Sequence, residues 1–159
     1  MERSVLEAIR GFLQESRVLS LAVLVDGDPE AALLPFACRE DYGAVYVQAS
    51  GLARHARGLQ PGARVGLLVH ANDTADTDPM QLSRLSVHAT VAVLEKASRE
   101  FASAGARFIA RFPAAEMTLG LQDFNLYELT LGRGRYVEGF ARAFNIGPDT
   151  FSEVAILRP

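Results

Sequence analysis

The residues with the clearest potential for chemistry lie in one stretch, from Val45 to Arg57. There an apolar run ends at small and hydroxyl residues, and we expect a short helix to follow at once, over 52–59. A helix N-terminus presents free backbone N–H groups and a positive dipole end, and together these bind phosphate. Arg54 adds a planar guanidinium that holds two phosphate oxygens, and His55 adds a second donor. The alternative is an ordinary solvated basic turn with Ser50 as the N-cap, and the residue types alone favour that alternative.

Other reactive residue types form no recognisable motif. There is no dinucleotide-binding glycine pattern, P-loop, zinc-protease motif or nucleophile elbow. The acidic stretch 73–78 lacks the central glycine and terminal glutamate of a calcium loop. Cys38 ends an apolar strand and is expected to be a small buried side chain. Three histidines stand alone, without metal-ligand spacing: His55, His70 and His88. We therefore expect no metal site, and the sequence identifies no catalytic residue.

The composition narrows the class of protein. The chain has 159 residues, of which 49% are hydrophobic and 22% charged, and its formal net charge is −3. This length suits a single domain over residues 1–159, and the balance of residue types excludes a disordered chain. The negative charge argues against nucleic acid, and no apolar run is long enough to cross a bilayer or to act as a secretory signal. We expect a cytoplasmic protein that binds a small molecule.

Apolar periodicity predicts a mainly β protein with peripheral helices. Ser4 and Glu7 have the spacing of a capping box before an amphipathic helix over 5–16. The other predicted helices cover 52–59 and 98–112, and 71–81 reads as a loop. Strands are expected at 17–25, 30–38, 44–49, 63–70, 84–94, 124–131 and 135–140, with Gly132-Arg133-Gly134 as the turn between the last two. Because the first three strands follow each other without crossover helices, we predict a closed or nearly closed antiparallel barrel rather than a doubly wound sheet.

The order of these segments resembles the flavin-binding split barrel of the pyridoxamine 5′-phosphate oxidase superfamily. The branch that contains haem-utilisation proteins is the most similar, and their additional C-terminal domain has no counterpart in these 159 residues. The matching segments cover nearly the whole chain: Leu21 to Phe36, 52–59, 63–69, Asp78-Pro79-Met80 with 82–90, 106–113, 123–129 and 139–146.

The resemblance implies a six-stranded split β-barrel that forms a homodimer, with FMN bound in two grooves at the subunit interface. It implies that the flavin phosphate contacts the strand end and helix start already singled out. The implied cofactor-binding residues are Gln48, Ala49, Ser50, Arg54 and His55, with Arg84 as a further contact in the flavin groove.

Three departures from the family pattern shape the expected function. Leu85 follows Arg84 where the oxidases usually carry Gln, Asn145 stands where relatives often carry Trp, and no Arg-x-His element follows it. We therefore expect an FMN-dependent oxidoreductase or flavin reductase of unknown substrate, and not a true pyridoxamine phosphate oxidase. One alternative is a flavin- or haem-binding carrier or sensor without turnover, in which His70 or His88 ligates the iron. Another is a dimeric barrel without a cofactor.

Overall fold

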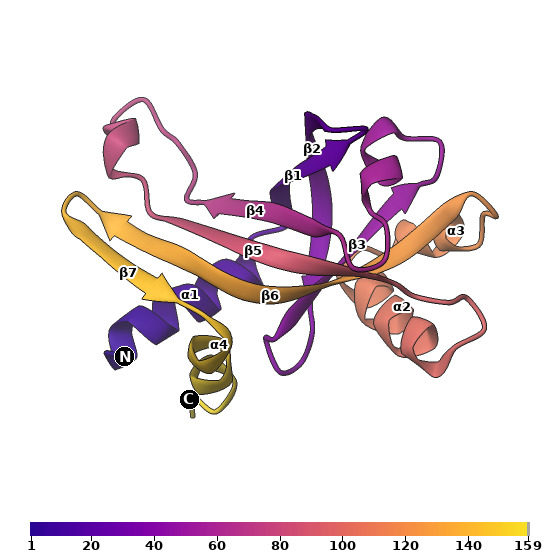
Figure 1. Ribbon diagram of the computed structural model, residues 1–159. Helices are drawn as coiled ribbons and strands as arrows, with labels where there is room; N and C mark the ends of the chain where they lie inside the picture. Colours follow the sequence, from indigo (N-terminus) through magenta and orange to yellow (C-terminus); the bar gives the residue numbers. More distant parts are fainter. Residues whose placement is uncertain (159) are drawn as a thin grey trace.

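A single antiparallel sheet closes on itself in the computed structural model, which describes residues 1–158 (Figure 1). Across these residues six strands form the barrel in the order β3-β2-β1-β4-β5-β6, and β3 pairs with β6 to close it. A seventh strand, β7, pairs with the C-terminal part of β6. The mainly β split barrel is therefore confirmed. The strands are β1 (Val18–Val25), β2 (Asp28–Cys38), β3 (Ala44–Ser50), β4 (Arg64–His70), β5 (Arg84–Val93), β6 (Phe124–Gly139) and β7 (Arg142–Ile146).

Alternation of side chains along each strand separates the barrel interior from its outer face. In β5, Leu85 and Val87 are buried, whereas Ser86 and His88 between and after them are exposed. The same alternation in β1 and β4 fills the interior with aliphatic side chains around Phe36, which is fully buried. Polar side chains on these strands therefore lie on the outer face, where a ligand can reach them.

Helices cover the two ends of the barrel (Figure 1). The helix α1 (Arg3–Glu15) packs beside α4 (Pro148–Ala155), and their apolar side chains are continuous with the barrel core. The helices α2 (Arg99–Arg111) and α3 (Ala115–Leu119) bury Phe108 and Leu119 in a second cluster against the sheet. Two 3₁₀ helices, η1 (Arg54–Gly58) and η2 (Pro79–Gln81), lie in connections. No helix within residues 1–158 is long and apolar enough to cross a membrane.

The amphipathic helix expected near the N-terminus is present as α1, but its predicted capping box and the predicted helix over 52–59 were wrong. The helix expected over 5–16 begins at Arg3, and Glu7 accepts a hydrogen bond from the Arg3 side chain (2.6 Å). Glu7 is thus engaged within the first turns of the helix, and the capping box with Ser4 does not define its start. The helix expected over 52–59 is the five-residue 3₁₀ helix η1.

The predicted pair of strands at 124–131 and 135–140 was also wrong, because β6 is continuous from Phe124 to Gly139. Gly132-Arg133-Gly134 forms an irregularity in the pairing with β5 rather than a turn. The strand β7 and the helices α3 and α4 were not predicted. Each has between five and eight residues, too few for apolar periodicity to stand out.

Candidate functional site

The turn after β3 holds the residues that the sequence singled out for phosphate. Because η1 has only five residues and begins at Arg54, it supplies little of the helix dipole on which that prediction relied. The Ser50 hydroxyl donates to Asp123 Oδ2 (2.7 Å) and accepts from the Leu52 backbone N–H (3.2 Å). Ser50 therefore fixes the turn, and its hydroxyl already has a carboxylate as its acceptor.

Arg54 is held by a carboxylate from a neighbouring strand. Its Nε forms an ion pair with Glu30 Oε1, and Glu30 belongs to β2. The Arg54 side chain is 64% exposed and that of Glu30 is 25% exposed. An incoming phosphate would have to share Arg54 with this carboxylate, and like charges brought together repel. The pair therefore weakens the turn as an anion site.

His55 is half-buried beside this pair. Its Nε2 atom is buried and has no hydrogen-bond partner within residues 1–158. Burial lowers the pKa of the His55 imidazole, and the Glu30 carboxylate acts in the opposite direction. His55 is thus held mainly as the neutral ring near neutral pH and contributes little positive charge to the turn.

The remaining predicted residues do not converge on this turn. The Gln48 side chain donates to Thr118 Oγ1 (2.7 Å), and Ala49 is buried within the barrel. Arg84 donates to the Leu82 carbonyl (3.0 Å) at the start of β5. Arg84 lies on β5, whereas Glu30, the partner of Arg54, lies on β2. Because β1 and β4 lie between these two strands, they are three strand spacings of about 4.8 Å apart. The structure therefore brings together Ser50, Arg54 and His55 only.

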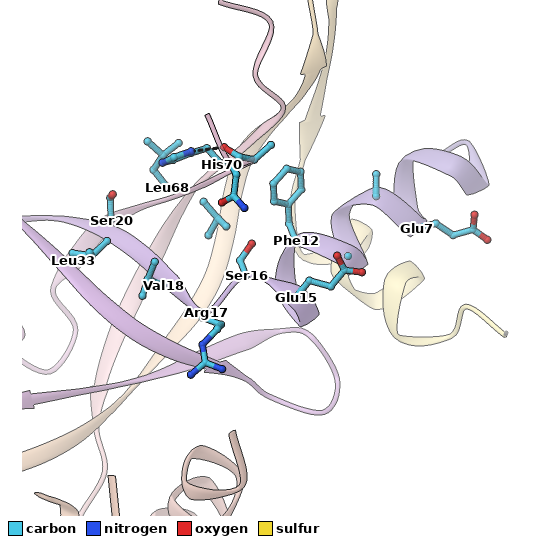
Figure 2. A pocket seen from close by; sticks show the side chains of 15 residues that line it. Glu7, Phe12, Glu15, Ser16, Arg17, Val18, Ser20, Leu33, Leu68 and His70 are labelled. Atoms are coloured by element: carbon cyan, nitrogen blue, oxygen red, sulfur yellow. Dashed lines mark hydrogen bonds between the residues drawn. The ribbon is translucent and has the colours of Figure 1, made fainter. Parts of the chain in front are cut away.

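A groove of about 720 Å³ lies between α1 and the outer face of β1, β2 and β4. Its lining is mixed, with apolar side chains from both the helix and the strands (Figure 2). The lining includes Phe12, Val18, Leu33, Leu68, Val69, His70 and Asn72. Figure 2 shows Phe12 projecting from α1 toward the strands, while the Arg17 side chain points away from His70.

His70 is the one lining residue of this groove with an imidazole ring, and its tautomer follows from a hydrogen bond. Its Nδ1 lies 2.7 Å from the backbone oxygen of Ala71. A carbonyl only accepts, so Nδ1 carries the proton and the neutral ring has its lone pair on Nε2. A histidine prepared to bind a metal has this arrangement, because the outer hydrogen bond orients the ring and raises its basicity. His70 was considered from the sequence only as one of two possible iron ligands, because neither its tautomer nor the groove depends on a local motif.

Cys38 and the acidic loop add no chemistry. The Cys38 thiol is buried near the Ala44 carbonyl (3.6 Å), and burial raises its pKa to about 12. The prediction of a small buried side chain is confirmed. Within residues 1–158, no group of three His, Cys, Asp or Glu side chains is placed to hold a metal ion.

The family model for pyridoxamine 5′-phosphate oxidase matches residues 5–138, which is most of the chain. The chain belongs to the pyridoxamine 5′-phosphate oxidase family. The resemblance described from the sequence is therefore confirmed, including its similarity to the haem-utilisation branch.

Several similar proteins carry names that refer to haem. The chain is 30% identical over 145 residues to the heme oxygenase HutZ of Vibrio cholerae, covering 89% of this chain and 80% of that protein. A structure of HutZ described as a heme storage protein superposes with a TM-score of 0.73 at 28% identity, covering 80% of this chain and 90% of that one. A heme binding protein from Mycobacterium smegmatis gives a TM-score of 0.82 at 26% identity over 96% of this chain. This chain spans only 62% of the mycobacterial protein.

Proposed function

We propose that this member of the family is a haem-binding protein and that His70 is the axial ligand of the iron. The observation that carries the proposal is the His70 hydrogen bond to Ala71, which leaves the Nε2 lone pair available at an exposed position in the groove. A histidine nitrogen is a common axial ligand of haem iron. The names of the similar proteins support the same cofactor.

The groove beside α1 offers a small-molecule ligand both apolar contacts and the polar side chains of Glu7, Glu15 and Arg17. Its volume of about 720 Å³ lies within the usual range for small-molecule sites. Phe12 and Leu68 offer apolar contacts on opposite walls, where they would exclude water from the ring. When bound, haem supplies a redox-active iron, and the protein's part is to provide the ligand and the surroundings that tune it. The hydrogen bond to the Ala71 carbonyl contributes by fixing the orientation and the tautomer of the His70 ring.

His88, the other histidine considered from the sequence, is less suited to iron. It lies on the outer face of β5 in a hollow that also contains Arg64, Arg133 and Arg135. Their positive charge disfavours a cation at the same place. This hollow shares no lining residue with the groove that contains His70.

FMN is the second candidate cofactor, because the sequence resembles a split-barrel family that binds flavin. The residues of the η1 turn do not fit the flavin phosphate as they stand. Glu30 pairs with Arg54, Asp123 takes the Ser50 hydroxyl, and His55 is held mainly neutral. An FMN-dependent oxidoreductase therefore remains a proposal with less support than haem binding. The expectation that the chain does not oxidise pyridoxamine 5′-phosphate stays a prediction, and a peroxide-coupled assay tests it.

We also propose that a second copy of the chain covers the outer face of β1 and β2. Leu24 and Leu33 on this face are 62% and 68% exposed. Ala22 pairs with Ala31 on one side and Gly66 on the other, so three small residues form a row that lets another sheet approach closely. Leu33 also lines the haem groove, so a partner on this face would complete that groove. A specific dimer of this kind should bury over about 1,000 Å².

Light scattering tests the dimer. We expect a dimer mass for the native chain and a monomer mass for Leu33→Glu, because a charge at the centre of the face opposes burial. Leu52→Glu is the control, since Leu52 is even more exposed but lies in the turn before η1. A monomer mass for the native chain at micromolar concentration would contradict the proposal.

Titration of the purified chain with hemin tests the main proposal. We expect a Soret band typical of histidine ligation in the native chain and in His88→Ala. In His70→Ala we expect that spectrum to be lost and the affinity to fall by about tenfold or more. A His70→Ala variant that binds hemin with the native spectrum would rule out His70 as the ligand. Tight binding of FMN with no binding of hemin would favour the flavoprotein instead, and binding of neither would favour the barrel without a cofactor.

A further inference from the structure

A second hollow lies on the outer face of β4, β5 and β6. It measures about 390 Å³. Its lining is basic and contains no acidic residue: Arg64, Ser86, His88, Arg133, Gly134 and Arg135. The hollow follows β5 from His88, which pairs with Gly66, to Ser86, which pairs with Leu68. It therefore adjoins the groove beside α1, but the two linings share no residue.

An irregularity in β6 brings two of the arginines to this face. Val87 pairs with Gly134 and Ala89 pairs with Leu131, so His88 stands opposite two residues, as in a β-bulge. Leu131 and Tyr136 are both buried although they are an odd number of positions apart, which would place them on opposite faces of a regular strand. The bulge therefore shifts the phase of the strand, and it is this shift that turns the following arginines outward.

Glycines on either side of Arg133 allow the strand to take this path. A Cβ atom on Gly134 would lie 2.3 Å from the Ser86 carbonyl oxygen, and one on Gly132 would lie 3.3 Å from the His88 carbonyl oxygen. The backbones of β5 and β6 thus approach more closely here than another residue type permits at Gly134. Arg133 and Arg135 consequently belong to a strand that is paired with β5, rather than to a flexible loop.

The charges of this hollow are not neutralised by the protein. Within residues 1–158, none of Arg64, Arg133 and Arg135 has a carboxylate oxygen within ion-pair distance. By contrast, at least one carboxylate pairs with each of Arg39, Arg54, Arg57 and Arg142. The Arg135 guanidinium donates to Asn145 Oδ1 (3.3 Å), which is a neutral acceptor and leaves the charge in place. Three guanidinium groups without acidic neighbours in a chain of net charge −3 form a local positive field.

We propose that this hollow binds a phosphorylated small molecule with two or more negative charges. Guanidinium groups hold phosphate oxygens in pairs, and the Ser86 hydroxyl and the His88 ring offer further donors on the same face. The site is distinct from the proposed haem groove, because the linings of the two share no residue.

Calorimetric titration of the full, haem-free chain with inorganic pyrophosphate tests the proposal. We expect binding that weakens by about tenfold in Arg133→Ala and in Arg135→Ala, because each removes one charge-assisted contact. Arg99→Ala is the matched control, since Arg99 is an exposed arginine in α2 and the change in net charge is the same. We expect the control and His70→Ala to bind pyrophosphate as the native chain does.

Parallel titrations with orthophosphate and with adenosine diphosphate distinguish the sources of the phosphate group. Binding of either, with the same dependence on Arg133 and Arg135, supports the proposal. The absence of pyrophosphate binding at millimolar concentration would overturn it, and so would equal weakening in Arg99→Ala. A change from dimer to monomer in Arg133→Ala without any pyrophosphate binding would also overturn it, by assigning the arginines to a contact between copies of the chain.

Discussion

Replacing Glu30 with glutamine should turn the η1 turn into a better phosphate site. In the native chain Arg54 shares its guanidinium with the Glu30 carboxylate, and any phosphate at Arg54 would lie close to that negative charge. Glutamine keeps the size of the side chain and removes the charge. We therefore expect Glu30→Gln to raise the affinity for FMN while leaving the affinity for riboflavin, which lacks the phosphate, unchanged.

The size of the effect follows from the exposure of the pair. Two unit charges 4 Å apart interact by about 4 kcal/mol at an effective dielectric constant of 20 and by about 1 kcal/mol in water. Because Arg54 is 64% exposed, the value in water is the better guide. A phosphate with one to two charges then gains about 1–2 kcal/mol, which corresponds to about 5- to 30-fold in affinity. The loss of the ion pair should lower the free energy of unfolding by no more than about 1 kcal/mol.

Flavin fluorescence quenching measures both affinities, and their ratio reports on the phosphate. We expect FMN and riboflavin to bind the native chain almost equally and FMN to be favoured about 5- to 30-fold in Glu30→Gln. Asp26→Asn is the matched control, because it frees the neighbouring Arg57 from an equivalent ion pair. A native chain that already prefers FMN strongly would refute the reasoning, and so would equal gains in Glu30→Gln and Asp26→Asn.

Three further predictions concern buried groups. Burial lowers the pKa of His55 in the folded chain, so the unfolded chain takes up a proton on this ring first as the pH falls through about 6.5. The free energy of unfolding should therefore decrease over this pH range, and urea titrations should show a smaller decrease for His55→Gln. Cys38, whose pKa burial raises to about 12, should react with a thiol reagent only as fast as the chain opens, and at once in denaturant; rapid reaction of the folded chain would contradict its burial. Gly58→Ala should destabilise the fold by about 1–3 kcal/mol in thermal unfolding, because its Cβ would lie 2.4 Å from the Leu24 carbonyl oxygen. Gly11→Ala in α1 should stabilise the fold in the same assay, because the nearest atom to its Cβ would be 3.9 Å away and alanine favours a helix over glycine.

The parts of the fold that depend on local patterns were predictable. The bounds of β4 and β5 agree with the predicted strands within one residue, because their apolar residues alternate and turn residues flank them. The path of β6 was not predictable in this way. Gly132-Arg133-Gly134 has the composition of a turn, and only the pairing with β5 determines that it continues as a strand with a bulge.

The candidate sites likewise combine features that depend on neighbouring residues with features that depend on contacts between distant segments. Ser50, Arg54 and His55 do lie in one turn, as the sequence indicated, because they are close along the chain. Their electrostatic state depends on Glu30, which reaches the turn from β2, and no local pattern in the sequence signals that contact. The groove beside His70 likewise exists only because α1 packs next to the outer face of the barrel. Features that depend on contacts between distant segments were therefore the ones that sequence patterns missed.

The bulge in β6 means that the two faces of this strand cannot be assigned by counting residues along the sequence. Strict alternation counted from Leu131 would place Arg133 and Arg135 in the barrel interior and Tyr136 in solvent, the opposite of what the structure shows. Because His88 stands opposite two residues of β6, removing Gly132 would leave a regular strand whose following residues keep their present faces. A sequence alignment with a relative that has a regular strand here would accordingly need a one-residue gap at Gly132 to keep every following residue on its own face.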